Sequence, residues 1–479
     1  MECANPTEEA RGSFWLRRPA GVATLFALSL FAAGLTQGDV RNDGALYSWV
    51  SRWMVLSGNW LDMYQDRGRT HYFNKPPLQF WIMACSIRTF GPTAASTRAV
   101  SVVFALGCAL LTYRIARRRL SPEGAATVVV VLATSYTFIK NCTGCRLDAG
   151  LTFFILMTLW SALRLIERPG GGAWNWVLLG AAVGLGIMAK GGVMLTGPMI
   201  AIGTFLWLGR RDLLLSPWIL ASLAVCLAIA APWHIHQYVQ WGDLFLNEYF
   251  FHQVLDRFEE GGFHKSTPWY YFIQLLVSMY WPWLPLAVWG AIGLFRPSAW
   301  RECPMVRLLL LWGCIYGGAI HFVDPKYDRY LCPLMPLLAI CAAWGMICLP
   351  LWDLWRRRLL PNLGWGALLV TALMEFTGVP MHRVELPEIQ SMRPVINGAV
   401  RFPGDPAVVF YGPAGISSRA MLRYFTEADV IEADDEALRA VPPGKIIMVA
   451  RDWRKRALEL MPPNVCLLEG KRFLFYLVR

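Results

Sequence analysis

The chain carries few charged residues for its length. Asp, Glu, Lys and Arg make up 16% of its 479 residues, whereas hydrophobic residues make up 56%. Soluble domains contain about 25% charged residues, so a purely soluble protein is excluded. Apolar runs of about 17–20 residues recur, which is the length needed to cross a hydrocarbon core of ~30 Å. They lie near 20–36, 97–115, 123–140, 148–166, 174–190, 193–209, 214–232, 269–295, 307–322, 331–350 and 361–379. We predict a polytopic all-α membrane protein with about eleven transmembrane helices.

Acidic residues are outnumbered, since 45 Lys and Arg oppose 33 Asp and Glu, for a net charge of +12. Such an excess can indicate nucleic-acid binding, but the arginines here cluster between apolar runs. With eleven spans and a cytoplasmic N-terminus, every cluster falls on the cytoplasmic side, as the positive-inside rule requires. The clusters are Arg17-Arg18, Arg114 with Arg117-Arg118-Arg119, Arg164 with Arg168, Arg210-Arg211, Arg296 with Arg301, and Arg356-Arg357-Arg358. The charge therefore indicates topology and argues against nucleic acid as a partner.

This topology places the segments 37–96 and 233–268 and the C-terminal tail on the outer face. Arg17-Arg18 ahead of an apolar run, with Ala32-Ala33-Gly34 behind it, has a weak signal-peptide appearance. Cleavage there would leave an even number of spans and invert the arginine pattern. We therefore expect an uncleaved first helix.

The sequence also lacks internal repeats, low-complexity tracts and a Gly-rich nucleotide fingerprint at a strand–helix junction. A transporter or flippase would carry paired repeats with ionisable or broken segments at mid-membrane. Most of the 12 cysteines lie in apolar runs, where Cys acts as a small hydrophobe. Cys142 and Cys145 differ, because they form a C-x-x-C on the outer side, as a reactive redox pair, a local disulfide or two idle thiols.

Two regions break the apolar pattern. In the polar insert 37–96, Leu46, Trp49, Val50, Trp53 and Met54 recur at helical spacing, which predicts an interfacial helix whose other face holds Ser48, Ser51 and Arg52. A second short apolar segment, 78–90, is expected to be interfacial as well. From Met381 the chain turns polar, with strand-like runs at 407–411, 445–450 and 473–478 and helical stretches near 416–425 and 451–460. We predict a transmembrane domain over 1–380 and a small outer-face α/β domain over 381–479.

Two acids lie where outer-face helices are expected to begin. Asp43 opens the first interfacial helix, and Asp148 follows Arg146 at the start of a span. Each could simply stabilise a helix N-terminus, yet acid–base chemistry also needs a positioned carboxylate. Cations are scarce on the same face, and guanidinium and ammonium groups bind phosphate. The outer-face cations are Lys75, Lys190, Arg257, Lys326 and Arg329. Together these residues predict a membrane-level site for a lipid-borne phosphate, with a carboxylate serving an acceptor.

The loop 233–268 is the longest outer segment after the insert, and it contains several histidines. Glu248, His252 and His264, with His234 and His236, could hold a metal. No spacing among them matches a compact zinc motif. A divalent metal is therefore left open, and no cofactor is required.

An ordered set of short motifs gives the chain a family resemblance. These are Asp43 to Tyr47, Met54 to Trp60, Tyr72 to Pro77, Arg146-Leu147-Asp148, Ala189-Lys190-Gly191, Pro232-Trp233, Tyr249 to Phe258, Pro268 to Tyr271, and Lys326 to Tyr330. In this order they resemble the GT-C class of glycosyltransferases that use lipid-linked sugars. The similar branch contains bacterial aminoarabinose transferases and relatives of protein mannosyltransferases.

The resemblance implies an inner-membrane enzyme that moves a sugar from a polyprenyl phosphate donor to an envelope lipid, glycan or protein on the outer face, with inversion. By resemblance, Asp43 is the catalytic aspartate and Asp148 assists it. Lys75, Arg257, Lys326 and Arg329 would bind the donor phosphate. Further substrate-binding candidates are Tyr47, Tyr72, Arg146, Lys190, His252 and Tyr330.

Three positions depart from the family pattern. Many members have Asp-Glu where this chain has Asp43-Gly44, and Glu where it has Asn74. The second change weakens a metal site, because that glutamate can hold a metal in relatives. The aminoarabinose branch also tends to have Arg where this chain has Leu46, so the resemblance assigns no acceptor. The alternatives are a flippase of a lipid-linked glycan, a scaffold protein, and a polymerase or ligase that uses a diphosphate-linked glycan.

Overall fold

The structure is a computed structural model, and it describes residues 19–33, 35, 40, 43–66, 68, 70–168, 173–255, 267–297, 303–323, 325–377, 387–399, 408–411, 420, 423–424, 426, 430–469 and 473–479. The chain divides into two compact units. The first, the membrane unit, contains Met1–Ala33, Val102–Cys142 and Leu147–Val379. The second, which we name the outer unit after its predicted location, contains Gly34–Ser101, Thr143–Arg146 and Pro380–Arg479. The predicted division into 1–380 and 381–479 stays a prediction. The outer unit contains both the insert and the tail.

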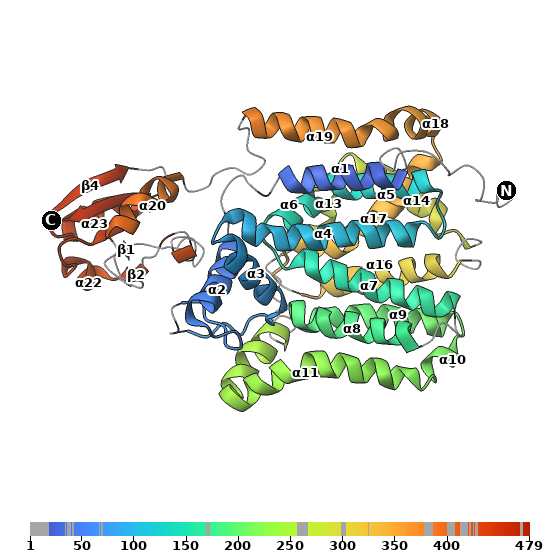
Figure 1. Ribbon diagram of the computed structural model, residues 1–479, viewed down its shortest axis with the longest axis horizontal. Coiled ribbons are helices and arrows are strands. Elements are labelled where there is room, and N and C mark those ends of the chain that lie inside the picture. Colours follow the sequence, from blue (N-terminus) through green and yellow to red (C-terminus); the bar gives the residue numbers. More distant parts are fainter. Residues whose placement is uncertain are drawn as a thin grey trace. The chain divides into compact units, whose positions relative to one another are not determined.

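The membrane unit is helical, and most of its helices run side by side in Figure 1. Their bounds are α1 Pro19–Ala33, α4 Ala94–Ala116, α5 Pro122–Thr134, α6 Tyr136–Thr143, α7 Asp148–Glu167, α8 Ala173–Lys190, η2 Gly191–Leu195, α9 Thr196–Trp207, α10 Arg211–Leu214, α11 Trp218–Phe245, η3 Leu246–Leu255, α13 Tyr271–Met279, α14 Trp283–Leu294, α16 Pro304–His321, η4 Asp328–Leu334, α17 Met335–Ile347, α18 Trp352–Leu354, η5 Trp355–Leu359 and α19 Leu360–Thr377.

Each apolar run predicted from the sequence corresponds to one of these helices or to a consecutive pair. Within the described residues, six helical segments are long and apolar enough to cross a membrane, or up to eight if each of two bent pairs counts as one span. The bent pairs are α5 with α6, at 66°, and α13 with α14, at 114°. The multi-pass helical architecture is confirmed, while the number eleven stays a prediction.

The segment 233–268 is not a loop over its first half, which corrects the sequence-based expectation. α11 continues through Pro232 to Phe245, and the π-helix η3 extends the helical region to Leu255. Gly242 interrupts this region with a φ of 48°. The apolar run alone marked only the membrane-crossing part of this long helix.

In the outer unit, the insert forms the two predicted helices, α2 Asp43–Ser57 and α3 Leu78–Phe90. The expected polar face of α2 is wrong in part, because Ser48 and Ser51 are fully buried. Each hydroxyl donates to the carbonyl four residues earlier, Gly44 for Ser48 and Tyr47 for Ser51. Small hydroxyl residues can thus lie in a packed interface without an unsatisfied polar group.

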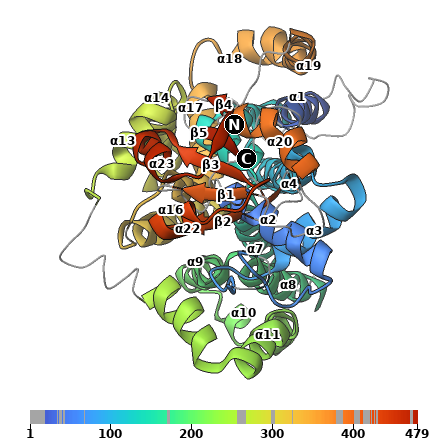
Figure 2. The same cartoon turned by 90° about the vertical axis from the view of Figure 1, so that its left-hand side faces the viewer.

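The tail forms the predicted α/β domain. Its helical elements are α20 Pro387–Ala399, α22 Asp435–Arg439, η6 Arg451–Trp453 and α23 Arg454–Leu460. Its strands are β1 Val408–Tyr411, β2 Val430–Ala433, β3 Ile446–Ala450, β4 Asn464–Glu469 and β5 Phe473–Val478, in the order β2-β1-β3-β5-β4 (Figure 2). β1 pairs in parallel with β2 and β3, whereas β5 is antiparallel to β3 and β4. Sequence patterns indicated β1, β3 and β5 and missed β2 and β4, because short strands with polar residues give little hydrophobic signal.

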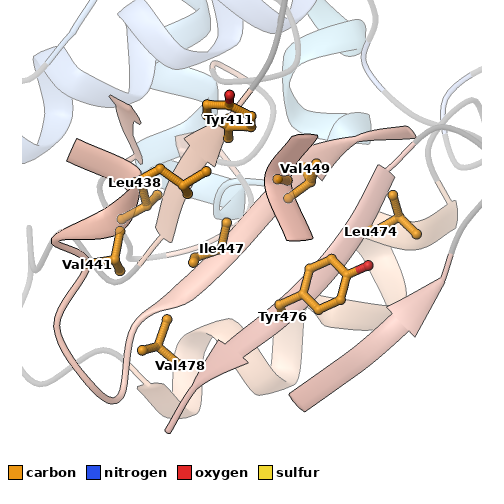
Figure 3. Close-up of a cluster of buried hydrophobic side chains, with 10 residues drawn as sticks. Tyr411, Leu438, Val441, Ile447, Val449, Leu474, Tyr476 and Val478 are labelled. Carbon is orange, nitrogen blue, oxygen red and sulfur yellow. The ribbon is translucent and has the colours of Figure 1, made fainter. Parts of the chain in front are cut away.

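Alternate residues of the inner strands build one core of the tail. Val409 and Tyr411 of β1, with Ile447 and Val449 of β3, lie in a buried cluster that β5 and α22 complete (Figure 3). The opposite-facing residues Val408, Phe410, Ile446, Met448 and Phe475 are buried as well. A sheet buried on both faces explains why these strands are almost continuously apolar.

Candidate active site

In the outer unit, the start of α2 packs directly against the loop Thr143–Arg146. A Cβ added to Gly44 would lie 2.8 Å from the carbonyl oxygen of Gly144 and 3.1 Å from that of Cys145. Backbone atoms cannot move aside easily, so a side chain here would displace either the loop or the helix start. The departure from Asp-Glu at Asp43-Gly44 therefore has a steric reason in this chain.

Three further contacts hold the same loop. The Cys145 thiol lies 3.5 Å from the Ser48 hydroxyl and 3.6 Å from the Met83 sulfur. The Ser101 hydroxyl donates to the carbonyl of Arg146 at 3.0 Å. Cys145 has a φ of 55°, a left-handed conformation that is uncommon for a residue other than glycine. Burial raises the pKa of the Cys145 thiol, and both Cys142 and Cys145 are free thiols in the structure.

Asp43 is the first residue of α2 and is half-buried. A carboxylate in the first turn of a helix interacts favourably with the positive end of the helix dipole. Tyr47, one turn later, is buried with its ring 5.4 Å from that of Phe80, and Tyr72 lies 5.7 Å from the same ring. Both tyrosines thus belong to the aromatic core that fixes α2 against α3.

Lys75 precedes Pro76 and Pro77, which lead into α3 at Leu78. Its ammonium group donates to the carbonyl of Asn74 at 2.8 Å, and the side chain is half-buried. Proline fixes φ and restricts the preceding residue. The cation is therefore carried on a stiff segment of the insert.

In the membrane unit, helix ends bring a second group of predicted residues together. Asp148 is the first residue of α7 and Lys190 the last of α8, and their side chains form an ion pair. The Lys190 ammonium also lies 5.9 Å from the centre of the Tyr330 ring, in η4. The Asp148 side chain is 3% exposed, and a buried carboxylate is stable only with a partner of opposite charge.

A second ion pair, which sequence reasoning missed, joins α6 to η4. Lys140 of α6 donates to Asp328 of η4 at 2.6 Å. Lys140 was counted as the end of an apolar run, and only its tertiary neighbour makes it part of the site. Arg329 follows, with its guanidinium 4.3 Å from the Tyr327 ring. The Tyr316 hydroxyl of α16 donates to the Tyr330 carbonyl at 3.2 Å, which holds η4 against α16.

Lys326, predicted to bind phosphate, is buried at 3% exposure. Its ammonium group lies 3.3 Å from both the carbonyl and the hydroxyl oxygen of Thr267. A buried ammonium needs such acceptors.

Other predicted residues lie apart from these groups or outside the described residues. Arg257 and His264 lie outside them, and of His252 only the backbone, in η3, is described. Glu248 is exposed on η3. Arg146 is half-buried, and its carbonyl accepts from Ser101. Within the described part of the chain, no three His, Cys, Asp or Glu side chains are arranged to hold a metal ion.

Comparison with known proteins gives one family match and several matches to single proteins and solved structures. Residues 74–236, which begin just before Lys75 and include Asp148 and Lys190, match the Dolichyl-phosphate-mannose-protein mannosyltransferase family. The solved structure of ArnT from Cupriavidus metallidurans, bound to undecaprenyl phosphate, superposes with a TM-score of 0.75 at 17% identity, over 95% of this chain and 97% of that one. The chain has the GT-C glycosyltransferase fold.

Two further matches have lower identity or cover less of the matched protein. The undecaprenyl phosphate-alpha-4-amino-4-deoxy-L-arabinose arabinosyl transferase of Pseudomonas aeruginosa (strain UCBPP-PA14) is 29% identical over 313 residues, 64% of this chain and 55% of the relative. The chain thus spans about half the length of the curated relatives it matches. The oligosaccharyltransferase AglB from Archaeoglobus fulgidus, in complex with an inhibitory peptide and a dolichol-phosphate, has a TM-score of 0.56 at 12% identity, over 92% of this chain and 70% of that one. The resemblance inferred from the motifs is confirmed at the level of the fold.

Proposed function

We propose that this protein transfers a sugar from a polyprenyl phosphate donor to an envelope lipid, glycan or protein. The observation that carries the proposal is the shared fold over 95% of the chain with a structure that holds undecaprenyl phosphate. The cations and acids described above supply the chemistry such a reaction needs. The absence of a nucleotide fingerprint from the sequence also favours a lipid-linked donor.

In the proposed reaction, an acceptor hydroxyl attacks the anomeric carbon while the bond from that carbon to the phosphate oxygen breaks. Asp43 takes the hydroxyl proton, and the displacement inverts the anomeric centre. The leaving phosphate needs little protonation if positive charge surrounds it. We assign this role to Lys75, Arg257, Lys326 and Arg329.

The ion pair of Asp148 with Lys190 indicates that Asp148 and Asp43 have different roles. The Asp148 side chain is 3% exposed and is already bound to the Lys190 ammonium group, so an acceptor hydroxyl has little access to it. Asp148 would therefore hold Lys190 and the neighbouring Tyr330 toward the substrate, and Asp43 would serve as the base.

We further propose an inner-membrane location with the N-terminus in the cytoplasm and the tail outside, as the arginine clusters indicate. Relatives are named for transfer of 4-amino-4-deoxy-L-arabinose, so a pentose or hexose linked to undecaprenyl phosphate is the donor class to test first. Nothing favours the flippase alternative.

The decisive experiment is transfer from a radiolabelled pool of polyprenyl-phosphate sugars to envelope acceptors by the purified protein in lipid. We expect Asp43→Asn to abolish transfer without lowering the unfolding temperature. Asp452→Asn, on the exposed surface of the tail, removes an equivalent charge and serves as control. Equal transfer by wild type and Asp43→Asn would move the base elsewhere, and flipping of labelled lipid without transfer would refute the enzyme.

A further inference from the structure

In the outer unit, an arginine of α2 binds the insert to the tail. The Nη1 atom of Arg52 donates to the carbonyl oxygens of Arg423 and Thr426, each at 3.1 Å, and also to that of Tyr424. Three carbonyls from one turn of the tail thus converge on a single guanidinium group. Hydrogen bonds from a charged donor are stronger than those from a neutral one.

The receiving turn is itself fixed on both sides. The Arg423 side chain donates to the carbonyl of Val430, where β2 begins, at 2.9 Å. The Tyr424 hydroxyl donates at 2.8 Å to the carbonyl of Thr93, which directly precedes α4. Tyr424 and Thr426 are at most 1% exposed. The turn is therefore a buried connection between the tail sheet and the insert.

Arg52 also stands on the helix that begins with Asp43. The two residues are nine positions apart on α2, about 14 Å along the helix axis. The Asp43 end is packed against the loop at Gly144, and the Arg52 end is held by the tail. A helix held at these two points cannot rotate or slide without breaking one of the contacts.

We propose that Arg52 is a positioning residue, through which the tail holds α2 so that Asp43 meets the acceptor in the correct geometry. This inference rests on the proposed function. It gives the tail a role in the chemical step without requiring that the tail touch a substrate. Misplacement of a catalytic group by about 1 Å can reduce rates by about a hundredfold.

The test compares Arg52→Met and Arg52→Lys with the wild type in nanodiscs. We expect Arg52→Met to reduce kcat about tenfold or more while the KM for the lipid-linked donor and the affinity for undecaprenyl phosphate stay unchanged. Arg52→Lys should recover part of kcat, because its ammonium group still donates to carbonyls. Arg88→Met, an exposed arginine of α3 in the same unit, is the matched control and should leave kcat unchanged.

Amide hydrogen exchange supplies a second readout that needs no turnover. In Arg52→Met, exchange should rise in α2 and around residues 423–430 and stay unchanged in α7 and α8. The inference would be overturned if exchange rises at 423–430 while either exchange in α2 or kcat stays unchanged. A parallel loss of donor affinity and a fall in unfolding temperature would also overturn it. If the wild type transfers no sugar, the proposed function fails, and α2 exchange alone decides whether the tail positions this helix.

Discussion

At the residue scale, the ion pair of Asp148 with Lys190 shows how this chain accommodates buried charges. Asp148 lies in the first turn of α7 and Lys190 in the last turn of α8. Each therefore also interacts favourably with the dipole of its own helix. Each charge is thus stabilised both by the other charge and by the dipole of its own helix.

Removal of the cation alone should be costly. Lys190→Met leaves the Asp148 carboxylate buried without its ammonium partner, and breaking a buried ion pair costs about 3–5 kcal/mol. We expect a clear fall in unfolding temperature in detergent. The double variant Asp148→Asn with Lys190→Met should recover part of it, since no charge remains unpaired. A single variant as stable as the wild type would mean that the pair does not stabilise the fold.

A second residue-scale prediction concerns Gly44. Gly44→Ala places a methyl group 2.8 Å from the Gly144 carbonyl, so α2 or the loop must shift and Asp43 with it. We expect sugar transfer to fall about tenfold or more. Gly398→Ala, in α20 of the same unit with open space around it, should have no effect. Full transfer by Gly44→Ala would show that the start of α2 tolerates displacement.

At the element scale, glycines let pairs of helices approach closely. A Cβ on Gly290 of α14 would overlap the Cys341 carbonyl of α17, and one on Gly345 would overlap the Leu286 carbonyl. On another pair, a Cβ on Gly180 of α8 would overlap the Ser222 carbonyl of α11. Small residues at such interfaces are typical of membrane helices, whose association depends on close packing.

Alanine substitutions distinguish the effect of close packing on stability from the effect of helix propensity. Gly290→Ala should destabilise the membrane unit, because the overlap is with backbone. Gly366→Ala, in α19 with nothing near its Cβ, should be neutral or stabilise by about 1 kcal/mol through helix propensity. Thermal unfolding in detergent tests both, and equal effects would refute close packing as the reason for Gly290.

The bridge between Tyr64 and His71 in the insert gives a pH-dependent element. His71 pairs with Tyr64 in an isolated bridge and stacks on Phe73 at 5.1 Å. Burial lowers the pKa of His71 below its usual 6.5, and the nearby Asp62 and Asp66 partly oppose this. Because folding favours the neutral ring, its contribution to stability is present above the unfolded pKa and is lost as pH falls through the folded pKa.

We therefore expect the hydrogen-exchange protection of residues 64–73, corrected for intrinsic rates, to decrease as pH falls from about 7 to below 6. His71→Gln should remove most of this pH dependence, since its side chain does not titrate. Identical pH dependence in the variant would show that another group is responsible.

At the scale of the whole molecule, the chain combines a multi-pass helical unit with an outer unit assembled from distant segments. The insert and the tail, which residues 97–380 separate in the sequence, belong to the same compact unit. A division by sequence composition cannot find such a unit, because composition reports only on neighbours along the chain.

Native cysteines allow the proposed topology to be tested. Cys466 is exposed on β4 of the tail, and Cys348 is exposed just after α17, on the side assigned to the cytoplasm. In spheroplasts, a membrane-impermeant maleimide should label a variant that retains only Cys466. A variant that retains only Cys348 should require permeabilisation. The reverse pattern would invert the topology.

The sequence by itself determined the membrane class, the order of the helices and the main strands of the tail. These depend on the length and period of local apolar runs, and the hydrophobic effect acts on them wherever the rest of the chain lies. The acids and cations at the helix ends were also visible, since charged residues stand out in an apolar chain.

Only the tertiary structure decided how those charges are used. The partners of Lys190, Lys140 and Arg52 lie 42, 188 and more than 370 positions away in the sequence. The buried serines of α2 and the glycine at position 44 likewise depend on what packs against them. An ion pair, a guanidinium group bound by several carbonyls, or a close backbone contact depends on distance in space. The packing of the chain fixes that distance.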